Sequence, residues 1–70
     1  MNHEAVRSRD IAIVGYDDPT KTLEIAFRSG SVYQYAHVPS EVHQAFMLAP
    51  SRGIYFRDHI RGKYSFQKIA

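Results

Sequence analysis

The sequence predicts an α+β fold: a three-stranded antiparallel β-meander followed by two short α-helices packed on one face. Two observations predict this class. Residues 10–37 contain β-branched and aromatic runs separated by turn residues, and residues 39–61 contain apolar residues at helical spacing. A chain of 70 residues without cysteine has room for one small domain, which no disulfide can support. We therefore expect a single domain over residues 8–69 and a flexible N-terminus over residues 1–7.

Two strands are expected before residue 29. The first is the β-rich run Asp10–Tyr16, which is bounded by polar residues. The second is Thr22–Arg28, in which apolar and polar residues alternate. The segment Asp17–Lys21 is predicted to be the turn between them, because aspartate bonds to nearby backbone and proline presets φ. On these strands, the side chains expected to face the helices are Ile11, Ile13, Leu23, Ile25 and Phe27.

A third strand, Val32–His37, follows a Ser-Gly turn for which two hairpin registers are possible. A two-residue loop would place Tyr33 and Tyr35 on the face opposite the apolar side chains of the second strand. A three-residue loop with Gly30 in a bulge would place Tyr33 opposite Ile25 and both tyrosines on the apolar face. We favour the three-residue loop, because a small chain needs one strong apolar face for its helices to cover. The tyrosines are then core residues rather than an exposed platform for stacking bases.

Two helices are expected after residue 38. Pro39 suits the first turn of a helix, and Pro50 ends that helix because proline disfavours helical geometry in the residue before it. Ser51 is predicted to cap a second helix that runs to about Arg61, with Gly62 just beyond its end. The tail that follows can be a short strand or an irregular segment. The expected core also includes Tyr33, Tyr35, Val38, Val42, Phe46, Phe56 and Ile60.

Five motifs in order along the chain make the sequence similar to a known family. They are Ile13-Val14-Gly15-Tyr16-Asp17, Leu23-x-Ile25-x-Phe27-x-Ser29-Gly30, Tyr33-x-Tyr35-x-x-Val38-Pro39, Ser51-x-Gly53-x-Tyr55-Phe56 and Ile60-Arg61-x-x-Tyr64. Together they resemble the KTSC domain, which is named after a C-terminal extension of some lysyl-tRNA synthetases and also occurs as small stand-alone bacterial proteins. The resemblance covers residues 8–69 and implies a nucleic-acid-binding role through attachment to a tRNA enzyme. The family often has asparagine where this chain has Arg57, so no role of that asparagine carries over.

Positive charge is concentrated in the C-terminal part of the chain. Residues 51–70 hold five Lys/Arg against one Asp, whereas residues 1–50 hold four Lys/Arg against six Asp/Glu. Clustered cations release counterions from a polyanion, and aromatic side chains stack on bases. The alternative is that these cations only solvate the surface. The residues predicted to contact RNA or DNA are Arg52, Arg57, Arg61, Lys63, Lys68, Arg28 and Tyr64.

No pattern in the sequence is typical of an enzyme or a metal site. The four histidines show no ligand spacing, and the four glycines form no phosphate-binding loop. Ser40, His37 and Glu41 are close in sequence but lack the context of a nucleophile elbow. We therefore expect a non-enzymatic protein without cofactor, metal or small-molecule substrate.

Two further expectations concern location and partners. No apolar run approaches the roughly 20 residues of a membrane span, so we expect a cytoplasmic protein with no membrane contact. A small core and an open sheet favour burial of surface against another chain. A protein-interaction or homodimerisation module is therefore the alternative to nucleic-acid binding.

Overall fold

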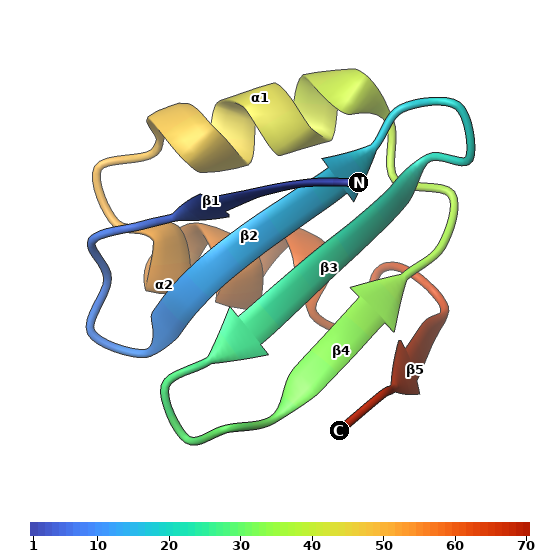
Figure 1. Ribbon diagram of the computed structural model, residues 1–70. Coiled ribbons are helices and arrows are strands. Elements are labelled where there is room, and N and C mark those ends of the chain that lie inside the picture. The colour runs from blue at the N-terminus through green and yellow to red at the C-terminus, as the bar shows by residue number, and fades with distance from the viewer.

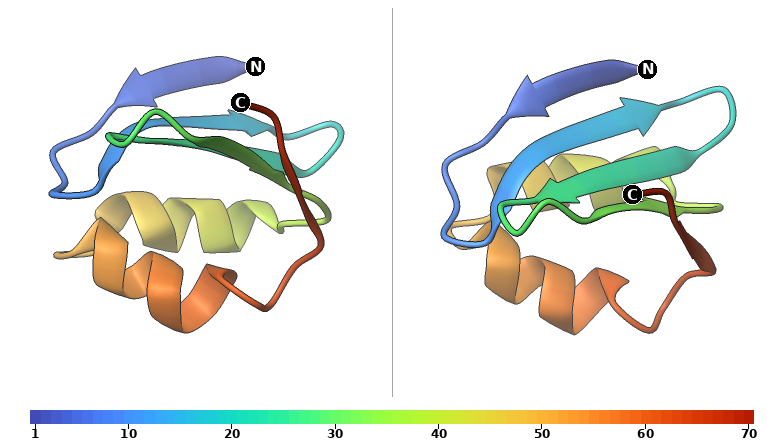
Figure 2. Two further views of the ribbon diagram at one scale, coloured as in Figure 1. Left: turned by 90° about the horizontal axis from the view of Figure 1, so that it is seen from below. Right: turned by 60° about the horizontal axis from the view of Figure 1, so that its bottom comes forward.

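The computed structural model describes residues 1–70 and shows two layers, a five-stranded sheet and a helical layer that covers one of its faces (Figure 1, Figure 2). The strands lie side by side in chain order, and each neighbouring pair is antiparallel. They are Asn2–Ala5 (β1), Ile11–Asp17 (β2), Thr22–Phe27 (β3), Val32–Tyr35 (β4) and Phe66–Lys68 (β5). The predicted α+β class with an antiparallel sheet and two helices is confirmed. The prediction of three strands is wrong, because the sheet has five.

The two strands that were not predicted come from the two ends of the chain. β1 lies within residues 1–7 and pairs with β2, with Asn2 opposite Tyr16. β5 pairs with β4, with Phe66 opposite Tyr35, so part of the C-terminal tail is a strand. Both strands are short and show no clear apolar alternation, so the sequence did not predict them. Each forms its backbone hydrogen bonds with an outer strand of the central meander, β1 with β2 and β5 with β4. Flexibility of residues 1–7 in solution stays a prediction.

The hairpin between β3 and β4 has the predicted three-residue register. Ile25 lies opposite Tyr33, and Leu23 lies opposite Tyr35. Gly30 has a φ of 104°, a conformation that glycine adopts without steric cost. Tyr35 is buried and Tyr33 is half-buried beside it. Both tyrosines therefore face the helices and belong to the core or its margin.

A β-bulge in β2 contradicts one part of the predicted core. Ile11 and Ile13 lie opposite consecutive residues of β3, so Ala12 is an extra residue in the ladder. The extra residue reverses the alternation, and Ile13 turns to the uncovered face, where its side chain is 39% exposed. Val14 takes the core position instead, with 1% exposure. Ile11 is buried as predicted.

The core lies between the sheet and the helices. Its buried residues are Val6, Ile11, Val14, Leu23, Ile25, Tyr35, Val38, Phe46 and Ile60. Among the other residues predicted for the core, Phe27, Tyr33, Val42 and Phe56 pack around its margin. Val6 was not predicted because it lies in the polar N-terminal segment; the structure places its side chain in the core with 8% exposure.

The helical layer contains two helices and a π-helical continuation of the second. Their bounds are Ser40–Leu48 (α1), Arg52–Tyr55 (α2) and Phe56–Ile60 (η1). Pro39 has extended backbone and immediately precedes α1 instead of occupying its first turn. Ser51 caps α2 as predicted, with its Oγ accepting from the Ile54 N–H at 3.3 Å, and Gly62 follows η1 with a φ of 75°. None of these helices combines the length and the apolar character that crossing a membrane requires.

A polar row on the uncovered face connects β1 to the centre of the sheet. His3 reaches across Gly15 of β2, and its Nε2 lies 2.6 Å from Oε2 of Glu24 on β3. Gln34 of β4 donates its side-chain N–H to Glu24 Oε1 at 2.8 Å. The hydrogen bonds from Gln34 and His3 hold the pKa of Glu24 below its usual value. A Cβ on Gly15 would lie 2.6 Å from His3 Cδ2, so only glycine leaves room for this crossing.

Candidate functional site

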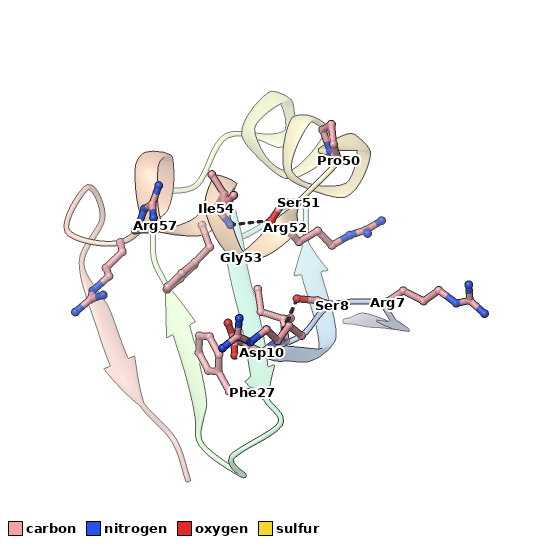
Figure 3. Close-up of a pocket in the computed structure, with 14 residues that line it drawn as sticks. Arg7, Ser8, Asp10, Phe27, Pro50, Ser51, Arg52, Gly53, Ile54 and Arg57 are labelled. Carbon is pink, nitrogen blue, oxygen red and sulfur yellow. Dashed lines mark hydrogen bonds between the residues drawn. The ribbon is translucent and has the colours of Figure 1, made fainter.

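A hollow of about 610 Å³ lies between the start of β2 and the α2–η1 segment. Residues 7–11 and Phe27 form one wall, and residues 50–54, Phe56, Arg57 and Arg61 form the other. Figure 3 shows the two walls facing each other, with Ser8 and Asp10 on the sheet side and α2 on the helix side. Five arginines and a single acidic residue, Asp10, contribute to the lining. We call this hollow the arginine groove, and its arginines are Arg7, Arg9, Arg52, Arg57 and Arg61.

The N-terminal wall of the arginine groove is held in place by Arg28. Its Nε donates to the backbone oxygen of Ser8 at 2.8 Å, and its Nη2 donates to the backbone oxygen of Val6 at 3.3 Å. These bonds tie the segment to the end of β3, and burial of Val6 anchors it further. These bonds hold the backbone next to Arg7 and Arg9 at the groove. The side chains of both arginines are exposed.

The helical wall begins with an arginine that serves the fold. Arg52 Nη2 donates to the backbone oxygen of Met47 at 2.6 Å, which satisfies a carbonyl in the last turn of α1. Arg52 Nε is buried and has no hydrogen-bond partner in the protein. The guanidinium of Arg52 thus connects the start of α2 to the last turn of α1. Its main role is to hold these two helices together, and it is less available to an anion than the exposed arginines are.

Two exposed arginines follow on the same wall. Arg57 Nε lies 3.0 Å from Asp58 Oδ1, and this contact raises the pKa of Arg57 and lowers the pKa of Asp58. Both side chains of the pair are exposed, so the pair contributes little to stability. Arg61 is also exposed and lies one turn further along. Arg57 can therefore exchange Asp58 for an incoming anion at small cost.

The structure brings three of the seven predicted contact residues together, namely Arg52, Arg57 and Arg61. The other four do not line the arginine groove. Arg28 braces its N-terminal wall, and Tyr64 packs against the core. Lys63 is exposed beyond η1, and Lys68 lies on β5 opposite Tyr33.

Arg7 and Arg9 are the groove residues that the sequence analysis missed. Arg7 was placed in the flexible N-terminus, residues 1–7, and the charges of Arg7 and Arg9 were counted with the acidic part of the chain. The available signal was the pair of arginines directly before the first predicted strand, since a residue next to a strand is held near the sheet. The brace from Arg28 to the backbone of Ser8 has no sequence pattern, so the meeting of the two basic segments could not be inferred.

Comparison with known proteins identifies relatives of two sizes. A segment of lysine–tRNA ligase from Nostoc punctiforme is 44% identical over 55 residues, which are 79% of this chain and 10% of the ligase. The corresponding enzyme from Trichormus variabilis is 42% identical over 55 residues, with the same coverage. The chain therefore spans about a tenth of the length of these ligases. An uncharacterized protein of Stutzerimonas stutzeri is 41% identical over 56 residues, which are 80% of this chain and 79% of that protein.

The fold and the family agree with these relatives. The crystal structure of a KTSC domain protein from Yersinia pestis matches with a TM-score of 0.94 and 43% identity, covering 99% of this chain and 97% of that chain. The model of the KTSC domain family matches residues 7–64, a range that includes every residue lining the arginine groove. The resemblance found in the sequence motifs is thereby confirmed, and the chain belongs to the KTSC domain family.

Proposed function

We propose that this KTSC domain is a non-enzymatic, cytoplasmic nucleic-acid-binding module that holds phosphates in the arginine groove. The observation that carries the proposal is that five arginines from residues 7–9 and 52–61 line one hollow whose lining contains a single carboxylate, that of Asp10. Cations clustered in a concave surface concentrate anions and release counterions from a polynucleotide on binding. Guanidinium groups are also suited to paired hydrogen bonds with phosphate oxygens.

The arginines have two separate roles in this proposal. Arg7, Arg9, Arg57 and Arg61 are exposed and contact phosphates directly. Arg57 lies within η1 and Arg61 directly follows the end of η1, so their two guanidinium groups can contact different phosphates of one strand. Arg28 and Arg52 brace the two walls, as their bonds to backbone oxygens show. Lys63 and Lys68 lie outside the groove and add long-range attraction to the same polyanion.

The similarity to part of lysine–tRNA ligase supports RNA as the first ligand to test. The ligases named above carry a similar segment within an enzyme whose name identifies tRNA as its substrate. A phosphate-binding domain would add affinity for tRNA to such an enzyme through a linked second contact. Because phosphate contacts carry no sequence information, we expect this domain to bind many sequences.

Amide chemical shifts of the isotope-labelled protein test the proposal. The ligands are tRNA, a single-stranded RNA and duplex DNA, each added at low salt because phosphate contacts weaken as salt rises. The expected shifts cluster in residues 7–10 and 51–61, which form the two walls. If none of the three ligands changes the amide chemical shifts, the proposal is wrong.

The alternative function is protein interaction or homodimerisation at the outer edge of β5. The observation that favours it is the exposure of two apolar side chains there, Phe66 at 61% and Ile69 at 50%. An edge strand can accept a further strand, and apolar side chains beside it add affinity. This association would persist at high salt, and sedimentation would show a mass above the 8.0 kDa of one chain.

A further inference from the structure

A second hollow, of about 540 Å³, adjoins the arginine groove on the helix-facing side of β4 and β5. Five of its seven lining residues are aromatic: Phe27, Tyr33, Tyr35, Phe56 and Phe66. The other two are Arg61 and Gly62, at the end of η1. We call it the aromatic hollow. The sequence predicted Tyr33 and Tyr35 to be core residues rather than a platform for stacking bases, so it gave these rings no binding role.

The two hollows share part of their walls. Phe27, Phe56 and Arg61 line both of them. Arg61 therefore stands where the charged groove meets the aromatic surface. A phosphate bound by Arg61 would leave the neighbouring base of the same strand within reach of the aromatic hollow, because Arg61 lines both hollows. This adjacency of cation and aromatic side chains matches the alternation of phosphate and base in the ligand.

The aromatic side chains form a closed floor and an open rim. Tyr35 is 5% exposed, and its ring packs edge to face on Phe56 at 5.7 Å. Phe66 lies on the rim, with its ring centre 5.9 Å from that of Tyr35 and 5.8 Å from that of Tyr33. Although it contacts both tyrosines, Phe66 is 61% exposed. A flat aromatic ligand lying against Phe66 would cover this exposed ring.

We propose that the aromatic hollow accepts an unpaired base of the strand whose phosphates lie in the arginine groove. The ligand class is then single-stranded or looped nucleic acid rather than continuous duplex. A base inside a duplex is paired and stacked on both faces, so it would have to be flipped out before it could bind. Flipping costs free energy for unpairing and unstacking, and an unpaired base does not have this cost of unpairing. This inference rests on the proposed function, since the phosphate contacts place the base.

Stacking is the main interaction that the hollow offers a base. Its lining is aromatic except for Arg61 and Gly62, and stacking on aromatic rings tolerates every base because each has a π-face. Lys68 lies opposite Tyr33 on β5, where its ammonium can attract the next phosphate. The domain should therefore bind single strands with higher affinity than duplexes, and its affinity should depend little on base sequence.

Three ligands of equal length separate stacking from phosphate binding. They are a single-stranded oligonucleotide, its abasic counterpart with the same phosphates and no bases, and a blunt duplex. Measured at one low salt concentration, affinity for the single strand should exceed affinity for the abasic strand by about tenfold, the contribution of one stacked base. The duplex should also bind more weakly than the single strand.

Variants of Phe66 test the same point from the protein side. Phe66→Leu keeps an apolar residue on β5 but removes the π-face, so affinity for the single strand should fall about tenfold and affinity for the abasic strand should not change. Leu48→Ala is the matched control, because Leu48 is an apolar side chain with 85% exposure outside both hollows. The chain has no tryptophan, so Phe66→Trp supplies a single indole whose fluorescence should be quenched by the strand with bases and not by the abasic strand.

Each result decides between the two proposals. Equal affinity for all three ligands, with Phe66→Leu unchanged, overturns the base-binding proposal and leaves phosphate binding in the groove. Binding of none of them, the abasic strand included, overturns the proposed function itself. Quenching of the Phe66→Trp fluorescence by protein concentration alone would assign the hollow to a second copy of the chain and would also overturn base binding.

Discussion

The salt dependence of binding gives the sharpest prediction for the arginine groove. Four exposed arginines line it: Arg7, Arg9, Arg57 and Arg61. If each neutralises one phosphate of a single strand, the logarithm of the affinity should fall with the logarithm of the salt concentration with a slope of about −2.8. Between about 50 mM and about 200 mM salt, the affinity of the unchanged protein should then decrease about 50-fold.

Replacing two of these arginines should halve that slope. The double variant Arg57→Gln, Arg61→Gln leaves two contacts, so the slope becomes about −1.4 and the affinity falls only about sevenfold over the same salt range. Fluorescence anisotropy of a labelled single-stranded oligonucleotide, titrated at several salt concentrations, measures both slopes. The variants should fold normally, because both side chains are exposed and only the surface pair with Asp58 is lost.

A charge-matched control separates the groove from the net charge. Lys21 lies in the turn between β2 and β3, away from the groove lining, and pairs with Asp18 at 2.8 Å with both side chains exposed. Lys21→Gln removes one positive charge and should leave the slope unchanged. The single variant Arg57→Gln also removes one positive charge. If Lys21→Gln makes the salt dependence shallower by as much as Arg57→Gln does, the attraction comes from overall charge and the groove has no special role.

The remaining predictions concern the carboxylates and the sheet. Asp10→Asn should raise affinity for a polynucleotide a few-fold, because it removes the one negative charge from the arginine groove, and the same anisotropy assay measures it; unchanged affinity would place the phosphates elsewhere. Gly15→Ala should speed amide exchange in β1, because the new Cβ displaces the His3 ring and breaks its contact with Glu24; amide exchange of β1 measures this, and unchanged exchange would contradict it. The hydrogen bonds from Gln34 and His3 hold the pKa of Glu24 in the folded protein below its ordinary value. The stability that Glu24 contributes is therefore present above the ordinary pKa and is lost as the pH falls through the folded pKa. Urea unfolding should therefore show a smaller loss of stability on acidification for Glu24→Gln than for the unchanged protein, and equal losses would refute this linkage.

The central hairpin could be predicted because local and global patterns agree there. Leu23, Ile25 and Phe27 alternate with polar residues, and Gly30 permits the bulged turn that brings Tyr33 onto the same face. Ser51 is a standard cap residue followed by helix-compatible residues, which explains the correct start of α2. In each case the deciding interaction lies within a few residues of the pattern that predicted it.

The errors arise where a distant partner decides the structure. Ile13 follows a regular alternation, but a single extra residue in β2 turns it outward. β1 and β5 are short strands, and each pairs with an outer strand of the central meander, β1 with β2 and β5 with β4. Arg7 and Arg9 reach the arginine groove because Arg28, which lies on a different strand end, binds the backbone beside them. Such long-range contacts have no local sequence pattern, so the N-terminal wall of the arginine groove could not be predicted from the sequence.

The side-chain Nε–H signals of the arginines test the central claim most directly. A nitrogen-15 spectrum of the protein, recorded with and without a single-stranded oligonucleotide at low salt, reports each guanidinium separately. The signals of Arg7, Arg9, Arg57 and Arg61 should shift together, because all four line the groove and are exposed. The signal of Arg28 should stay in place, because its Nε is bonded to the backbone oxygen of Ser8. Unchanged signals for the four groove arginines, in a sample where the oligonucleotide is bound, would contradict the account.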